Sequence, residues 1–156
     1  MATFVVVHGA WGGAWSWNKY IVPMLREAGQ TVFPVTLTGL GDRSHLSSPD
    51  VSLDTHIQDV VNVLFYEDLS DVILVGHSYG GNVITGVADR VPERLQQLVY
   101  LDAATPSDGQ SSADSFAPRG ASTVIRNPPA VAVAPSIRGS TGSCTWNTAR
   151  VPGVAA

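Results

Sequence analysis

The chain alternates short, predominantly apolar segments with longer segments in which apolar and polar positions are mixed. Four of the apolar segments are rich in β-branched residues: 3–7, 31–35, 71–75 and 95–101. Apolar runs of about four to eight residues are typical of strands buried on both faces of a parallel sheet. Helices are expected between them, over 15–28, 54–67 and 82–90. The alternation predicts an α/β fold, with three α/β/α layers around a mostly parallel sheet.

The segment 54–67 has the clearest helical period. Its apolar positions are expected to face the core, and they are Ile57, Val60, Val61, Leu64 and Phe65. The segment 15–28 contains Pro23, which predicts either a kink or a restart of the helix with the proline at its first position. Gly29 is a suitable residue to end that helix.

Charge divides the 156 residues into two parts. All 13 acidic residues lie at or before Asp114, where they face five basic residues and give a net charge of −8. Residues 115–156 hold four arginines and no acid, a net charge of +4, and they have no strand or helix period. We therefore expect one folded core over 1–114 and an atypical tail, rich in Arg, Ala, Pro and Gly, that is extended or disordered.

The composition narrows the possible partners. The net charge is −4 without a basic stripe, so nucleic acid is not an expected partner. No apolar run approaches the ~20 residues that cross a membrane, and no signal-like segment precedes the first strand. Cys144 is the only cysteine, which excludes an internal disulfide and fits a reducing compartment. These features predict a cytoplasmic protein without a membrane partner.

Candidate chemistry begins at the sequence Gly-His-Ser-Tyr-Gly, residues 76–80. It has the G-x-S-x-G pattern of a nucleophile elbow, in which a serine occupies a strained turn between a strand and a helix. Gly76 and Gly80 are needed where a Cβ would collide with neighbouring backbone. The bare pattern is weak, but here a predicted strand precedes it and a predicted helix follows it. The alternative is an ordinary buried turn serine at Ser78.

Three chemically useful residues follow predicted strands: His8, Ser78 and Asp102. In parallel sheets, ligands bind at the carboxyl ends of the strands, so this edge is the expected place for a site. A glycine-rich loop, His8–Gly13, begins at the same edge. That loop could equally be a plain connection from strand to helix.

Together these motifs resemble the α/β-hydrolase superfamily. The resemblance is to small bacterial carboxylesterases related to plant methylesterases, hydroxynitrile lyases and pyrethroid-type ester hydrolases. It rests on four motifs: H-G-A-W with W-S-W at 8–17, L-T-G-L-G-D-R at 37–43, G-H-S-Y-G-G at 76–81 and L-V-Y-L-D-A at 98–103. The match covers residues 3–108, which correspond to the N-terminal half of a family domain, so the fold is expected to be C-terminally truncated.

The resemblance implies a serine hydrolase that acts on carboxylic esters. Ser78 would be the nucleophile and would carry the acyl group, while the backbone amides of Ala10 and Tyr79 would form the oxyanion hole. Tyr79 opens a helix, where free amides and the positive dipole end favour a developing negative charge. The expected partner is a small, fairly apolar ester, bound near the tryptophans at 11, 15 and 17. No cofactor is implied.

The fold orders its catalytic triad as serine, acid and histidine, but no histidine follows Ser78 in this sequence. The four histidines all lie at or before residue 77. We expect His8 to brace the oxyanion loop, His77 to pack beside the nucleophile and His56 to be solvated or half-buried. His45, in the loop over 36–49, could lean over the site. No carboxylate lies at ligand spacing from these histidines, so no metal site is predicted.

Several alternatives stay open. The chain could be a non-catalytic remnant or a ligand-binding protein that keeps the pocket, and a hydroxynitrile lyase is a third possibility. The lyase is disfavoured because Gly9 stands where those relatives place a threonine and because the only lysine is Lys19. Asp102 is expected to cap a turn rather than serve as a triad acid. The tail after about residue 115 is either an out-of-frame ending or native, and an exposed sheet edge could support a homo-oligomer.

Overall fold

The computed structural model describes residues 1–106, and its four strands form one parallel sheet in the order β2-β1-β3-β4. The strands are β1 (Thr3–Val7), β2 (Thr31–Val35), β3 (Val72–Ser78) and β4 (Leu95–Ala103). The helices are α1 (Ala14–Asn18), α2 (Ile21–Glu27), α3 (Leu53–Tyr66) and α4 (Gly80–Arg90), with 3-10 turns η1 (Gly41–Leu46) and η2 (Pro92–Arg94). The prediction for residues 115–156 lies outside the described residues.

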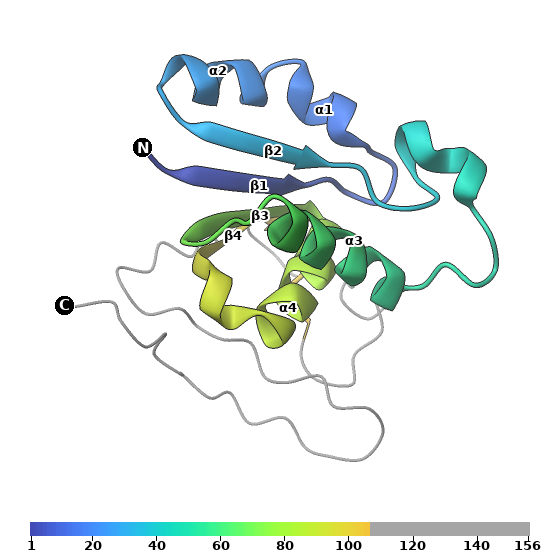
Figure 1. Ribbon diagram of the computed structural model, residues 1–156. Helices are drawn as coiled ribbons and strands as arrows, with labels where there is room; N and C mark the ends of the chain where they lie inside the picture. The colour runs from blue at the N-terminus through green and yellow to red at the C-terminus, as the bar shows by residue number, and fades with distance from the viewer. Residues whose placement is uncertain (107–156) are drawn as a thin grey trace.

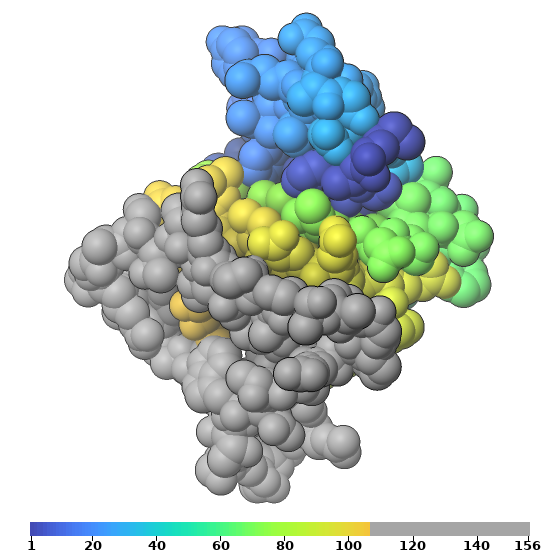
Figure 2. Space-filling model, turned by 90° about the vertical axis from the view of Figure 1, so that its left-hand side faces the viewer, coloured from blue at the N-terminus to red at the C-terminus, as the bar shows by residue number. Residues whose placement is uncertain are grey.

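Helices cover both faces of the sheet, which confirms the predicted α/β class and its three layers. Helices α1 and α2 lie on one side and α3 and α4 on the other (Figure 1). Viewed from the side on which the strands begin, the lighter blue atoms of the segments that follow β1 lie above the dark-blue start of the chain, and the green and yellow segments lie below it (Figure 2).

Each face of the sheet has its own hydrophobic core, because successive strand residues point in opposite directions. Val5 and Val7 of β1 are fully buried against α3 and α4, in a cluster that includes Val60 and Ile84. Val6 points to the other face and packs with Trp17 of α1 and Val22 of α2. Strands that are apolar on both faces therefore explain the continuous apolar runs of the sequence.

The helix predicted over 15–28 is interrupted. Helix α1 ends at Asn18 and α2 restarts at Ile21, so Pro23 is the third residue of α2 and not the first. The first turn of a helix lacks internal acceptors for its amides, and a proline is therefore tolerated there. The prediction of a restart is confirmed, and the predicted position of the proline is wrong by two residues.

Helix α3 buries most of the face that its sequence predicts. Leu64 and Val60 have no exposed surface, but the side chain of Phe65 is 62% exposed. Phe65 lies at the margin of the apolar face, with the Arg94 guanidinium 5.8 Å from its ring centroid and the Tyr66 ring packed edge-on. The prediction that Phe65 belongs to the core is wrong, because its side chain lies outside the buried cluster that α3 forms with the sheet. Among residues 1–106, none of the helices is both long and apolar enough to span a bilayer.

Candidate active site

Ser78 occupies a strained turn between β3 and α4. Its φ is +52°, in the left-handed region that residues with a Cβ rarely adopt, and Tyr79 follows as the N-cap of α4. A Cβ at Gly76 would lie 2.6 Å from the carbonyl oxygen of Gly80, and a Cβ at Gly80 would lie 2.8 Å from that of Val7. Both glycines are therefore required by close contact between backbones, as the spacing of the motif predicts.

The glycine-rich loop after β1 lies directly against Ser78. A Cβ at Gly9 would be 3.1 Å from the Ser78 Cβ and 3.5 Å from its Oγ. The carbonyl of Gly9 accepts a 3.0 Å hydrogen bond from the Gly12 amide, which closes the loop into a turn. The carboxyl ends of β1 and β3 thus bring the loop and the serine together, as predicted. The Ser78 Oγ is half-buried and has no hydrogen-bond partner within residues 1–106.

The amides of Ala10 and Tyr79 belong to the two segments that meet at Ser78. Within the described part of the chain, neither amide donates a hydrogen bond to another backbone or side-chain group. The Tyr79 amide also lies at the N-terminal end of α4, where the partial positive charge of the helix dipole is concentrated. The arrangement is suited to bind a negatively charged oxygen.

His8 fixes the loop from inside the protein. Its ring is 1% exposed, its Nε2 accepts a 3.1 Å hydrogen bond from the Leu37 amide, and its Nδ1 donates to the Gly9 carbonyl at 2.6 Å. Burial lowers the pKa of His8 below its ordinary value, and so the ring stays neutral. The contacts agree with the predicted bracing role, and neither ring nitrogen is free to act as a base.

His56 is more deeply placed than the sequence suggested. It is 7% exposed, where a solvated or half-buried position was predicted. Its two ring nitrogens lie 2.8 Å from the Tyr79 hydroxyl and 2.8 Å from the Thr38 carbonyl oxygen. Burial raises the pKa of Tyr79 to about 12, so this phenol remains protonated. Position 56 is four residues before Val60, which places it on the buried face of α3 and is the signal that could have revealed it.

Sequence reasoning also missed Thr38 and Asp59. The Asp59 carboxylate accepts hydrogen bonds from the Thr38 amide at 2.6 Å and from the Thr38 hydroxyl at 2.8 Å. Arg43 approaches the same carboxylate at 3.5 Å and donates to the Thr36 carbonyl at 3.0 Å. The loop after β2 is therefore fastened to α3.

The remaining candidates lie at the surface. His77 is exposed, and its ring lies edge-on to the buried Trp17 at 6.3 Å between centroids. It therefore packs next to Ser78 at the surface, where a Cβ at Gly9 would be 3.3 Å from its Nδ1. His45 is exposed in η1. Strand β4 does not end at Asp102 but continues to Ala103, and the exposed Asp102 has a φ of +45°. Its carboxylate accepts no hydrogen bond within residues 1–106, so the predicted turn cap is not found there.

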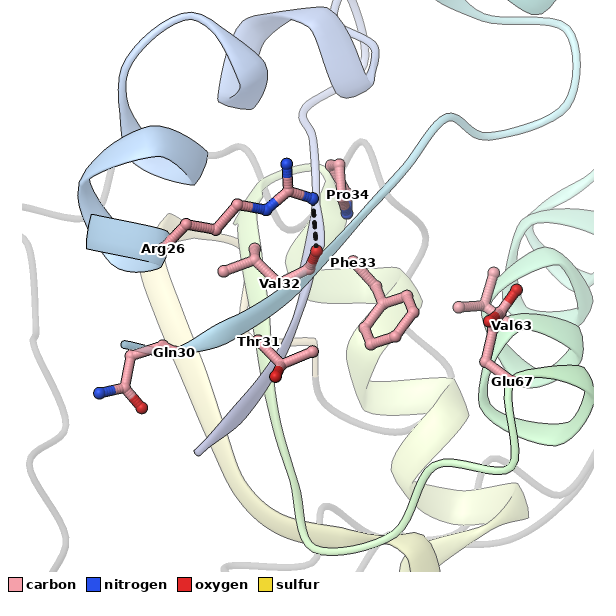
Figure 3. Close-up of a pocket in the computed structure, with 8 residues that line it drawn as sticks. All are labelled: Arg26, Gln30, Thr31, Val32, Phe33, Pro34, Val63 and Glu67. Carbon is pink, nitrogen blue, oxygen red and sulfur yellow. Dashed lines mark hydrogen bonds between the residues drawn. The ribbon is translucent and has the colours of Figure 1, made fainter. Parts of the chain in front are cut away.

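An open groove of about 520 Å³ lies elsewhere, along the outer edge of β2. It is lined by residues of α2, β2 and α3, with Arg26 donating a 3.2 Å hydrogen bond to the Val32 carbonyl (Figure 3). None of the residues that line it comes from the His8–Gly13 loop or from the elbow. Among residues 1–106, no three His, Cys, Asp or Glu side chains lie close enough to hold a metal ion.

A parallel sheet with helices on both faces and a strained serine at its carboxyl edge defines an α/β protein of the hydrolase type. The sequence model of the alpha/beta hydrolase family matches residues 4–153, and the chain belongs to that family. Hydroxynitrile lyases and pyrethroid hydrolases are also among the proteins it resembles, in agreement with its motifs.

The chain is 55% identical, over 71% of its length and 46% of the relative's, to a carbendazim hydrolyzing esterase from Nocardioides sp.. It is 37% identical to putative methylesterase 14 of Arabidopsis thaliana, over 72% of this chain and 32% of the other. An extracellular alpha/beta-hydrolase from a Paenibacillus species superposes with a TM-score of 0.69 and 38% identity, over 75% of this chain and 47% of that one. The chain thus spans less than half the length of these relatives.

Proposed function

We propose that Ser78 is the nucleophile of a carboxylic-ester hydrolase. The observation that supports this most is its φ of +52° at a turn whose two flanking glycines are required by backbone contact. Strain of this kind is retained where function needs a side chain presented in a fixed direction. The esterases and methylesterases among the relatives support ester chemistry for the same site.

In the proposed reaction, Ser78 Oγ attacks the ester carbonyl carbon and the carbonyl oxygen becomes an oxyanion. The amides of Ala10 and Tyr79 donate hydrogen bonds to this oxygen, in a geometry fixed before the substrate arrives. The C–O bond to the alcohol then breaks, and the departing alkoxide takes up the proton that the Ser78 hydroxyl has lost. Water later attacks the acyl group, which releases the acid and restores the Ser78 hydroxyl. His8 and His56 are fully engaged in hydrogen bonds, and we assign the base that accepts the serine proton to neither.

Small, fairly apolar esters are the proposed substrates. Trp11 of the loop is 96% exposed and Trp15 of α1 is 58% exposed, which provides aromatic surface beside the loop. Trp17 does not contribute, since it is 6% exposed and belongs to the core under α1. This corrects the expectation that all three tryptophans surround the substrate.

The experiment is covalent labelling of the full chain by a fluorophosphonate, beside hydrolysis of p-nitrophenyl acetate. We expect labelling of one serine, lost in Ser78→Ala and retained in Ser70→Ala, a matched change at an exposed serine. Retention of the label by Ser78→Ala would refute the assignment. A folded wild-type chain that takes no label would instead favour a ligand-binding protein without catalysis, and cleavage of a cyanohydrin without esterase activity would favour a lyase.

A further inference from the structure

A continuous series of hydrogen bonds connects the two segments that carry the proposed oxyanion-hole amides. At one end, His8 of the glycine-rich loop accepts from the Leu37 amide at 3.1 Å. At the other end, the Tyr79 hydroxyl contacts His56, and His56 contacts the carbonyl of Thr38 at 2.8 Å. Leu37 and Thr38 are adjacent, so two successive residues of one loop anchor both segments.

The direction of each hydrogen bond follows from the groups involved. The Thr38 carbonyl can only accept, so Nε2 of His56 carries a proton and donates to it. In the neutral ring Nδ1 is then an acceptor, and the Tyr79 O–H donates to it. The raised pKa of Tyr79, about 12, keeps that proton in place. Every polar group in this series therefore has a partner.

The loop that joins the two ends is itself held rigidly. Leu37 has no exposed surface, and Asp59 binds both the amide and the hydroxyl of Thr38. Asp59 lies three residues after His56 on α3, so both side chains reach Thr38 from the same helix face. Because these bonds act in series, a displacement of the elbow relative to the glycine-rich loop has to break at least one of them.

We propose that His56 is a positioning residue that, through Thr38, holds Tyr79 and its amide in register with the glycine-rich loop. This inference rests on the proposed function, because the register matters only if the two amides stabilise an oxyanion. Removal of a whole donor typically reduces the rate by about 10²–10³. Loosening one donor that remains present costs less, and we expect about tenfold.

The test compares fluorophosphonate labelling of Tyr79→Phe, His56→Gln and the double variant with that of the wild-type chain. Tyr100→Phe is the matched control, because it also removes a part-buried tyrosine hydroxyl with a 2.8 Å hydrogen bond, to Thr85 of α4. The maximal labelling rate should fall about tenfold in both single variants, with an unchanged concentration for half-maximal labelling. The double variant should be no slower than either single variant, because both changes break the same connection.

The rate constant distinguishes positioning from a loss of folded protein, which lowers the amount labelled and leaves the rate constant unchanged. The imidazole ¹⁵N spectrum gives a second readout: His56 Nδ1 should shift in Tyr79→Phe and stay unchanged in Tyr100→Phe. Wild-type labelling with an unaltered rate in Tyr79→Phe, or additive effects in the double variant, would overturn this inference alone. A folded wild-type chain without any label would overturn the proposed function and this inference with it.

Discussion

At the scale of single residues, backbone contact decides what position 76 tolerates. An added Cβ would meet the backbone of Gly80, which has no flexible end to move aside. Gly76→Ala should therefore lower the free energy of unfolding by about 3 kcal/mol or more, since overpacking against rigid groups typically costs ~1–3 kcal/mol. Urea unfolding monitored by tryptophan fluorescence measures this change.

Gly29→Ala is the control for the same substitution without a contact. Gly29 has a φ of +76° and no atom within 4 Å of an added Cβ, so only the left-handed backbone is strained. We expect a loss of about 1 kcal/mol there. Equal losses at the two positions would show that contact with Gly80 is not what requires glycine at the elbow.

The site residues also differ in how far the sequence could reveal them. The elbow at 76–80 is local: its glycines, serine and flanking elements are consecutive, so the pattern predicts the turn and its close contacts. The contacts of His56 join residues 18 and 23 positions away in the chain, and they depend on how α3 settles on the sheet. No periodicity encodes such a distance, and only the position of His56 on the buried face pointed to it.

At the scale of elements, the two ends of the α3 apolar face should respond differently to truncation. Leu64 is fully buried on the inner face of α3. Leu64→Ala should therefore reduce the free energy of unfolding by about 3 kcal/mol, through lost burial and the cavity left behind. Phe65→Ala removes a larger side chain that is 62% exposed and should cost less than about 1 kcal/mol. If Phe65→Ala reduced the free energy of unfolding, measured with urea, more than Leu64→Ala does, Phe65 would have to be counted as part of the core.

The same contrast explains which element boundaries were predictable. Strands β1 and β2 match their predicted ranges because β-branched apolar runs begin and end abruptly. Strand β4 extends two residues beyond its apolar run, since pairing with β3 continues to Ala103 after the burial pattern has ended. The break between α1 and α2 was visible only indirectly, through Pro23.

At the scale of the whole molecule, the two edge strands of the sheet differ in how readily they could pair with another strand. At β2, Pro34 lacks an amide and Arg26 occupies the Val32 carbonyl, which are two means of blocking the addition of another strand. Strand β4 forms the opposite edge among the described residues. A homo-oligomer formed through an exposed edge therefore remains a prediction, and β4 is the better candidate for it.

The pH dependence of stability is the last property of the whole molecule that the structure predicts. Burial holds the pKa of His8 below 6.5 in the folded protein, whereas the unfolded chain protonates this ring near 6.5. Between these two pKa values the unfolded state binds more protons, so the free energy of unfolding must fall as the pH falls. The contribution is fully present above about pH 6.5 and is lost as the pH decreases towards the folded pKa. The slope reaches at most about 1.4 kcal/mol per pH unit for one group.

His8→Gln isolates this contribution, because glutamine offers hydrogen-bonding atoms that do not titrate. We expect the wild-type chain to be the more stable near pH 8 and its advantage over His8→Gln to shrink as the pH falls to about 5, measured by urea unfolding at each pH. Titrating groups that do not interact with His8 affect both proteins alike and cancel in the difference. A difference that stays constant over this range would mean that His8 titrates equally in the folded and unfolded states. The assignment of a neutral His8 ring between the Gly9 carbonyl and the Leu37 amide would then be wrong.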